Sequence, residues 1–108
     1  MPESSNRGAL TEAVYYILLS LCTPLHGYGI MQNVKELSND RVVLGAGTLY
    51  GALNTLVSKG WIVPYTNEGS SRKKEYVITD EGKLILKNEI KRLKELVYNG
   101  TEILGEVF

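Results

Sequence analysis

The strongest constraint on the fold is a repeating apolar pattern in residues 80–108. Its six apolar residues are spaced four, three, four, seven and three positions apart: Leu86, Ile90, Leu93, Val97, Leu104 and Val107. This is a heptad pattern, interrupted where Gly100 falls, and it predicts one long amphipathic helix. Such a helix cannot bury its apolar stripe against the rest of so small a chain. The pattern therefore predicts that these six residues form a dimer interface.

Three shorter helices are expected before it. The first is capped by Thr11 and ends before Pro24, because the residue before a proline avoids helical geometry. Its inward face carries Val14, Ile17, Leu18 and Leu21. The second begins at Gly27 and stops at residues 38–40. Its inward face carries Ile30, Met31, Val34 and Leu37. The third covers about residues 48–59, between a Gly-Ala-Gly turn and a glycine suited to its C-terminal cap.

Strand signals lie between and after these helices. Residues 41–44 look extended, and residues 61–63 and 75–78 are rich in β-branched and aromatic side chains. The last two segments predict a hairpin with a long polar tip at residues 67–74. Thr79 is placed to cap the final helix. The expected fold class is mainly α with a small β-hairpin.

The single cysteine and the single histidine limit which metal sites and disulfides the chain can form. Cys22 is the only cysteine and His26 the only histidine, so the sequence predicts no internal disulfide, no Cys/His metal site and no cofactor. His26 is expected to serve as a turn or capping residue. The start of the chain has no apolar signal core, and no apolar run approaches the roughly 20 residues needed to cross a bilayer. We expect a cytoplasmic protein that does not use a membrane.

The charges are balanced overall but unevenly placed. Twelve basic residues match twelve acidic ones, so net charge favours no partner. The segment 41–74, however, has five basic residues and one acidic residue, Glu68. The basic residues are Arg41, Lys59, Arg72, Lys73 and Lys74. The middle of the chain is therefore the segment most suited to an anionic partner.

The outer face of the third helix is small and uncharged. Leu49, Ala52, Leu53, Leu56 and Val57 cluster on one side of a helical wheel, and the other side carries Gly47, Gly51, Asn54, Thr55 and Ser58. Small residues allow close approach to the DNA major groove, and Asn, Thr and Ser can bond base edges or phosphates. A plain solvent-facing helix is the alternative that this composition leaves open.

The tip of the hairpin is polar and ends in three cations. Its candidate DNA-contacting residues are Ser70, Ser71, Arg72, Lys73 and Lys74. Such a loop can lie along a phosphate backbone as a wing and would supply affinity more than sequence choice. The same cations could instead protect an edge strand from aggregation.

Four motifs together resemble the PadR family of bacterial transcriptional regulators. They are His-Gly-Tyr-Gly-Ile at 26–30, Gly-Thr-Leu-Tyr-Gly-Ala-Leu at 47–53, Leu-Val-Ser-Lys-Gly-Trp-Ile at 56–62, and Arg-Lys-Lys-Glu-Tyr-Val-Ile-Thr-Asp-Glu-Gly at 72–82. The chain resembles the short branch of that family, which has a single C-terminal helix. The resemblance implies a flexible tail at 1–9, a winged helix-turn-helix DNA-binding domain at 10–79 and a dimerisation helix at 80–108.

The resemblance also implies residue roles. The hydroxyls of Tyr28 and Tyr50 would bond phosphates, although both rings could instead be core aromatics. Thr48, Gly51, Asn54 and Thr55 would face DNA. Lys59, with Arg72 to Lys74, would neutralise backbone charge. The sequence departs from the family pattern at Gly51, where proline is frequent, and at Gly45-Ala46, where a Ser-Pro type entry to the helix is more typical.

The function implied is that of a transcriptional regulator. A homodimer would bind double-stranded DNA at a roughly palindromic operator. Repression is expected, because no further segment is present to recruit polymerase. The resemblance leaves open a small aromatic or drug-like effector at the dimer interface, since some relatives bind one there. However, Leu93 stands where a stacking tryptophan would be expected, and Trp61 is expected to pack on the third helix.

Two other classes of function fit the sequence less well than this one. An enzyme is disfavoured, because the sequence has no phosphate-binding loop and no paired carboxylates in a distinctive context. A winged-helix module that binds protein is the main alternative, because the fold does not dictate the function. Such a module should carry exposed apolar residues near the third helix and the hairpin.

Overall fold

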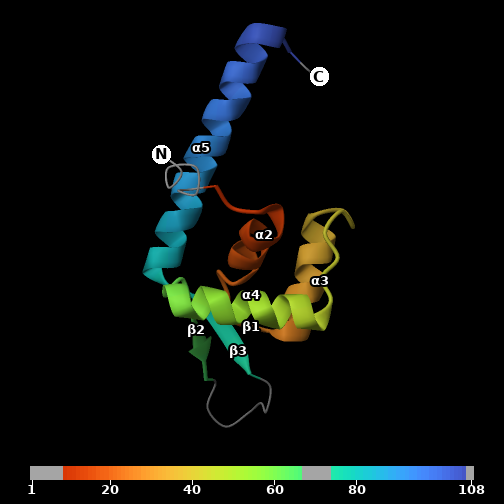
Figure 1. The fold of residues 1–108 in the computed structure, drawn as a ribbon, viewed down its shortest axis with the longest axis vertical. Helices are drawn as coiled ribbons and strands as arrows, with labels where there is room; N and C mark the ends of the chain where they lie inside the picture. The colour runs from red at the N-terminus through yellow and green to blue at the C-terminus, as the bar shows by residue number, and fades with distance from the viewer. Residues whose placement is uncertain (1–8, 67–73, 107–108) are drawn as a thin grey trace.

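The computed structural model describes residues 9–66 and 74–106. Four helices and three strands follow one another along these residues (Figure 1). Their order is α2 (Glu12–Ser20), β1 (Leu25–His26), α3 (Gly27–Leu37), α4 (Ala46–Lys59), β2 (Ile62–Tyr65), β3 (Glu75–Ile78) and α5 (Asp80–Leu104). This is the mainly helical winged fold that the sequence predicts.

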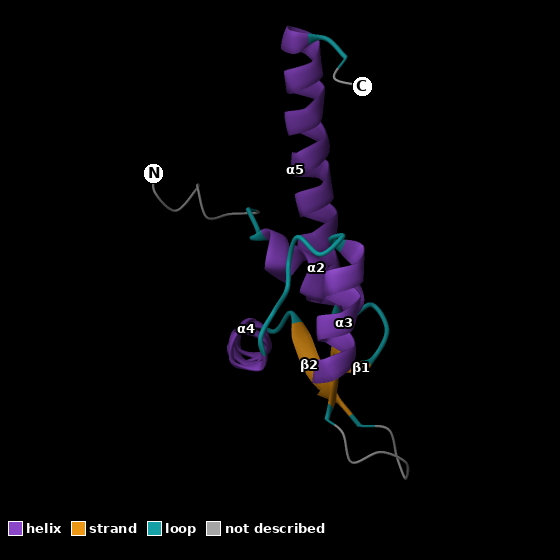
Figure 2. Cartoon of the chain, turned by 90° about the vertical axis from the view of Figure 1, so that its right-hand side faces the viewer, coloured by secondary structure: helices purple, strands orange, loops and turns teal. Residues whose placement is uncertain are grey.

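The elements form a compact head and one projecting helix. In Figure 1, α4 crosses the head below α2, α5 rises beyond it, and the hairpin of β2 and β3 points the opposite way. Figure 2 views α4 end-on and shows it on one side of β2, which it contacts. The C-terminal half of α5 therefore extends away from the rest of the chain.

The core lies where the helices of the head meet the sheet. Each element contributes apolar side chains at its own period, 3.6 for the helices and 2 for strand β3. Its fully buried members include Ile17, Leu18, Leu21, Ile30, Val34, Leu49, Leu53 and Ile62. The inward faces predicted for the three short helices are thus confirmed, except that Leu37 is 48% exposed at the end of α3.

The predicted helix caps are confirmed. The Thr11 hydroxyl accepts a hydrogen bond from the Val14 N–H (3.1 Å), and His26 Nδ1 accepts one from the Gly29 N–H (3.1 Å). Gly60 ends α4 in the left-handed conformation, with φ of 79°, which costs glycine little. These local bonds satisfy backbone groups that the helix ends would otherwise leave unpaired.

The start of α5 is joined closely to the end of α4. The Thr79 hydroxyl donates to the Gly60 carbonyl (2.7 Å) and accepts from the Gly82 N–H (3.0 Å). A Cβ on Gly82 would lie only 2.2 Å from the Trp61 carbonyl oxygen. Only glycine at this position lets the first turn of α5 sit against the backbone of Trp61.

The sheet contains one strand that the sequence did not predict. The two residues of β1 pair antiparallel with β3, Leu25 opposite Tyr76 and His26 opposite Glu75, so the strand order is β1-β3-β2. Strand β2 lies at the edge of the sheet. An edge strand tolerates Pro64, which has no N–H to donate.

Three other predictions need correction. Residues 41–44 are irregular rather than extended, because no strand lies beside them to pair with their backbone. Helix α4 begins at Ala46, two residues earlier than expected, with Gly45 as its N-cap. Leu86 is only 5% exposed, so it belongs to the core of its own chain and not to a dimer interface.

A buried carboxylate ties α5 to the start of α2. Glu89 is 2% exposed, and its carboxylate accepts hydrogen bonds from the Leu10 N–H (3.1 Å) and from two nitrogens of Arg92 (2.8 and 2.7 Å). The Arg92 hydrogen bonds lower the pKa of Glu89, and the Leu10 N–H adds to this effect, whereas burial opposes it.

Within the described residues, no helix is long and apolar enough to span a membrane.

We predict that Gly82→Ala lowers the free energy of unfolding by about 1–3 kcal/mol, because the new methyl group must displace the Trp61 backbone. Chemical denaturation measures this change. Gly51→Ala is the matched control, since nothing lies within 4 Å of its added Cβ, and it should stabilise the chain by about 0.5–1 kcal/mol. Equal effects of the two changes would contradict the close contact at Gly82.

We predict that Glu89→Gln lowers the free energy of unfolding by about 1–2 kcal/mol near neutral pH. Because the folded pKa of Glu89 is depressed, the stabilisation is full above the unfolded pKa, about 4.3, and is lost as the pH falls through the lower folded pKa. Denaturation curves from pH 7 to pH 3 test this, with the exposed Glu95→Gln as control. A difference between wild type and Glu89→Gln that did not shrink in acid would be inconsistent with the account.

Candidate nucleic-acid interface

The outward face of α4 is built as the sequence predicts. Its exposed residues Gly47, Thr48, Gly51, Asn54 and Ser58 lie opposite the buried Leu49, Leu53 and Leu56. Nothing lies within 4 Å of a Cβ added to Gly47 or Gly51, so this face is open to a partner. A polar surface of small residues can approach a groove of DNA closely.

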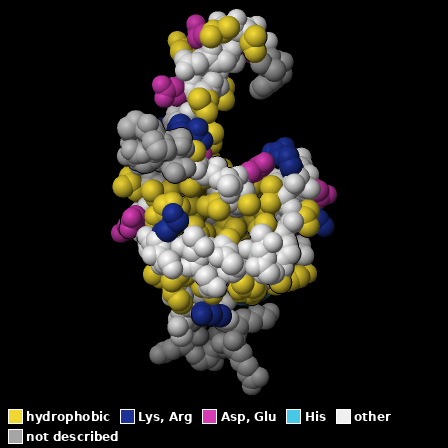
Figure 3. Space-filling view, in the orientation of Figure 1, with side chains coloured by type: hydrophobic (Ala, Val, Ile, Leu, Met, Phe, Trp, Pro, Cys, Tyr) yellow, Lys and Arg dark blue, Asp and Glu magenta, His cyan; other side chains and the backbone are white. Residues whose placement is uncertain are grey.

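Two other candidates on α4 lie to one side of this face. Thr55 donates to the Gly51 carbonyl (3.2 Å), and the Lys59 ammonium lies 5.0 Å from the centroid of the Trp61 ring. Both residues line a groove of about 660 Å³ that is also bordered by the starts of α2 and α5. In Figure 3, apolar side chains gather between α4 and α5 on the viewed face. Thr55 and Lys59 therefore border the outward face of α4 rather than occupy its centre.

Tyr28 and Tyr50 are surface residues and not core aromatics. The Tyr28 side chain is 64% exposed, and its hydroxyl accepts a hydrogen bond from Gln32 Nε2 (3.0 Å). With that lone pair occupied, the phenol can donate its own proton outward. Gln32 was missed by the sequence analysis, although it stands one helical turn after Tyr28 on α3.

Tyr50 is placed by a glycine. A Cβ on the buried Gly27 would lie 2.1 Å from the Tyr50 hydroxyl oxygen, so the ring of Tyr50 rests directly over the start of α3. The Tyr50 ring remains 45% exposed. This contact joins α4 to α3, which carries Tyr28. It also explains why glycine stands at position 27 of the His-Gly-Tyr-Gly-Ile motif, since any side chain there would meet Tyr50.

Only part of the wing can be described. Lys74 is exposed, with its ammonium 5.7 Å from the centroid of the Tyr76 ring. The other wing candidates, Ser70, Ser71, Arg72 and Lys73, lie outside the described residues, as does Val107 of the predicted dimer seam. The strands leading to the wing lie below α4 in Figure 1, on the side away from the end of α5.

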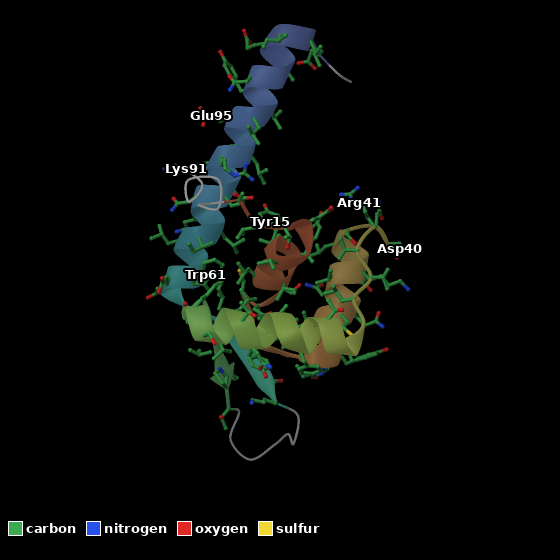
Figure 4. All side chains as sticks on the ribbon, in the orientation of Figure 1. Tyr15, Asp40, Arg41, Trp61, Lys91 and Glu95 are labelled. Atoms are coloured by element: carbon green, nitrogen blue, oxygen red, sulfur yellow. The ribbon has the colours of Figure 1, made fainter. Side chains whose placement is uncertain are left out.

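One cation counted in the basic middle segment is paired. Arg41 forms a salt bridge with Glu12 (2.6 Å), and the Glu12 carboxylate raises the pKa of the Arg41 guanidinium. Figure 4 places Arg41 beside Asp40 at the far end of α3, away from Trp61. Arg41 therefore adds less positive charge near α4 than the sequence suggested.

Several apolar side chains are exposed around this surface. Val43 and Val63 are 66% and 42% exposed, and Tyr65 is 41% exposed. The sequence analysis did not find them, because neither a loop sequence nor a strand pattern shows which side chains the folded chain leaves uncovered. The tyrosines can also donate hydrogen bonds, so they suit a phosphate backbone as well as a protein surface.

Comparison with known proteins identifies the family. The sequence profile of the family described as "Transcriptional regulator PadR-like family" matches residues 16–88. The chain belongs to the PadR-like family of transcriptional regulators. Members of this family are DNA-binding regulators and not enzymes.

Solved PadR structures share the fold. A PadR family transcription regulator from Clostridium difficile R20291 is 30% identical, with a TM-score of 0.70 over 87% of this chain and 98% of that chain. PadR of Bacillus subtilis, solved in complex with operator DNA, is 29% identical, with a TM-score of 0.63 over 76% of this chain and 48% of that one. These PadR-like neighbours confirm the resemblance and the winged fold.

A curated relative is much longer. An uncharacterised 37.1 kDa protein in transposon TN4556 of Streptomyces fradiae is 35% identical over 83 residues. The match takes in 73% of this PadR-like chain but only 23% of that protein, so the chain spans about a quarter of its relative.

We predict that Gly27→Ala weakens DNA binding by displacing Tyr50, while it changes the free energy of unfolding by less than about 1 kcal/mol because the displaced hydroxyl is at the end of a movable side chain. Titration with a DNA duplex measures the affinity. In a Tyr50→Ala background, Gly27→Ala should have no further effect on it. Additive losses in the double variant would show that the glycine acts by another route.

Proposed function

We propose that this PadR-like chain is a cytoplasmic homodimer that binds a roughly palindromic double-stranded operator and represses transcription. The observation that carries the proposal is the outward face of α4, which is exposed, small and uncharged. The sequence adds three cations, Arg72, Lys73 and Lys74, in the segment that follows β2. Helix α4 would enter the major groove, where Asn54, Thr48 and Ser58 are long enough to reach base edges or phosphates.

The tyrosines and the wing would fix the protein on the backbone. Tyr28, with its lone pair taken by Gln32, would donate to one phosphate, and Tyr50 would reach another over the start of α3. Lys59 and the cations Arg72 to Lys74 would neutralise phosphate charge. Bacillus subtilis PadR, 29% identical, was solved in complex with operator DNA, which supports DNA as the partner.

The free end of α5 supports the dimer. Val97, Ile103 and Leu104 are 65%, 84% and 81% exposed in the single chain, which is costly for apolar side chains that have no cover. Two copies related by a two-fold axis would cover them and present two α4 helices about 34 Å apart, one turn of DNA. A dimer bound at such a site over a promoter would block transcription by occupying the DNA.

An effector at the dimer interface receives less support. The hollow beside the predicted seam measures about 260 Å³ and is lined by Tyr15, Ile90, Leu93, Lys94 and Val97. Within the described residues, α5 places no aromatic ring in this hollow on which a flat ligand could stack. We therefore propose that the partner's α5 fills the hollow.

The proposal is tested by selecting bound sequences from a random DNA pool at near-physiological salt. We expect an inverted repeat for the wild-type chain, and we expect Val97→Asp to give a monomer that enriches none. Lys91→Asp is the matched control, because Figure 4 shows Lys91 and Glu95 on the side of α5 turned away from Tyr15.

Three outcomes would count against the proposal. A monomeric Val97→Asp chain that kept tight binding would rule out the dimer as the binding unit. If Lys91→Asp also lost enrichment, the effect of Val97→Asp could no longer be attributed to the apolar seam of α5. No enrichment by the wild type would favour the protein-binding module, for which the exposed Val43 and Val63 are the supporting observation.

A further inference from the structure

The outward face of α4 carries one side chain that can tell base pairs apart. Gly47, Gly51, Asn54 and Ser58 follow one another along this face, spaced four, three and four positions apart, and all four are exposed. Two of them are glycines without a side chain. Ser58 has a single hydroxyl, which can donate or accept and so fits more than one base. Along this line, only the Asn54 amide has a donor and an acceptor side by side.

The two threonines of the same helix discriminate less well. Thr55 donates its hydroxyl to the Gly51 carbonyl (3.2 Å), and its side chain lines the groove beside α4. Thr48 lies in the first turn of α4 and, like Ser58, has one hydroxyl. A single hydroxyl can fix the position of a helix in a groove, but it distinguishes bases poorly. Base discrimination by α4 therefore depends on Asn54.

The structure leaves Asn54 room to reach a base. Side chains on a helix lean toward its N-terminus, so the Asn54 amide extends over the preceding turn, where Gly51 stands. Nothing lies within 4 Å of a Cβ added to Gly51 or to Gly47. A base pair can therefore come close to the backbone of α4 beside the Asn54 amide.

We propose that Asn54 reads one adenine in each half of the operator, through two hydrogen bonds to the major-groove edge of the base. The amide nitrogen donates to adenine N7, and the amide oxygen accepts from the adenine N6 amino group. Guanine presents the acceptor O6 in place of that amino group, so its O6 would face the amide oxygen and the pairing is lost. The inference rests on the DNA binding proposed above and specifies which residue and which base set the sequence preference.

Chemical substitution in the DNA tests this contact directly. The full chain is titrated with its selected duplex, in which 7-deazaadenine replaces each common adenine in turn and so removes only N7. At one adenine of each half-site, the change should weaken wild-type binding about fivefold or more, and it should have no effect on Asn54→Ala. Ser58→Ala is the matched control, one helical turn along the same face, and it should keep the full penalty.

A change of preference tests the same contact from the protein side. Wild type should prefer A·T at this position by about 10- to 100-fold, whereas Asn54→Ala should accept all base pairs there about equally. Asn54→Arg should prefer guanine, because the guanidinium donates to both O6 and N7. Both replacements favour helix and stand at an exposed position, and chemical denaturation checks that the fold is kept.

The room beside Asn54 is tested by Gly51→Leu. The added side chain has open space in the free chain, so the free energy of unfolding should not fall. The leucine should nevertheless hold the base away from the Asn54 amide, so that 7-deazaadenine no longer carries a penalty. A penalty retained in this variant would show that Gly51 does not provide the room.

The outcomes separate this inference from the proposal beneath it. A 7-deazaadenine penalty that persisted in Asn54→Ala would overturn the inference and assign the adenine to another residue. An unchanged adenine preference in Asn54→Arg, or a selected sequence without a fixed A·T pair, would overturn it as well. Each of these results would leave DNA binding intact. A wild-type chain that selects no sequence would instead overturn the proposed function.

Discussion

The contact between Gly82 and the backbone of Trp61 determines how α5 is joined to the head that carries α4. It lets the first turn of α5 begin against the end of α4, where the Thr79 hydroxyl bonds both the Gly60 carbonyl and the Gly82 N–H. Both helices are therefore fixed to one short segment of backbone. Any movement of α5 about this joint would move α4 with it, so the geometry of a dimer made through α5 is transmitted to the surface proposed to read DNA.

The head of the molecule then holds α4 from its buried side only. Leu49, Leu53 and Leu56 fill the core, and Tyr50 rests on Gly27 at the start of α3. The outward face is left free of charge and of large side chains. The polar pairs at the margin, Gln32 with Tyr28 and Lys59 beside Trp61, surround this face with groups that can donate hydrogen bonds. This arrangement would let DNA approach the centre of the α4 face closely, while the groups at its edge contact phosphates.

Sequence reasoning recovered the features that depend on local bonds and on periodicity. The caps at Thr11, Gly60 and Thr79 and the core faces of the helices follow from short-range rules, and the structure confirms them. The features it missed depend on residues far apart in the chain. Strand β1 exists because Leu25 meets Tyr76, and Glu89 is buried because it bonds Leu10, 79 positions away.

The same reason explains the prediction errors around the candidate site. Residues 41–44 have strand-forming side chains but no neighbouring strand. Leu86 follows the heptad spacing, yet it packs into its own chain because the first turns of α5 lie on the head. The exposure of Tyr28 depends on how α3 docks, which periodicity alone does not determine. The roles of the α4 and wing residues in DNA binding stay predictions.

The most direct test of the account is a backbone-amide NMR titration of the isotope-labelled chain with a DNA duplex that it selects. We expect one set of signals for a symmetric dimer, with the largest shifts at Gly47, Gly51, Asn54 and Ser58 and in residues 66–74. Shifts confined to α5, or to the groove side of α4 at Ala52, would contradict the claim that the outward face of α4 reads DNA.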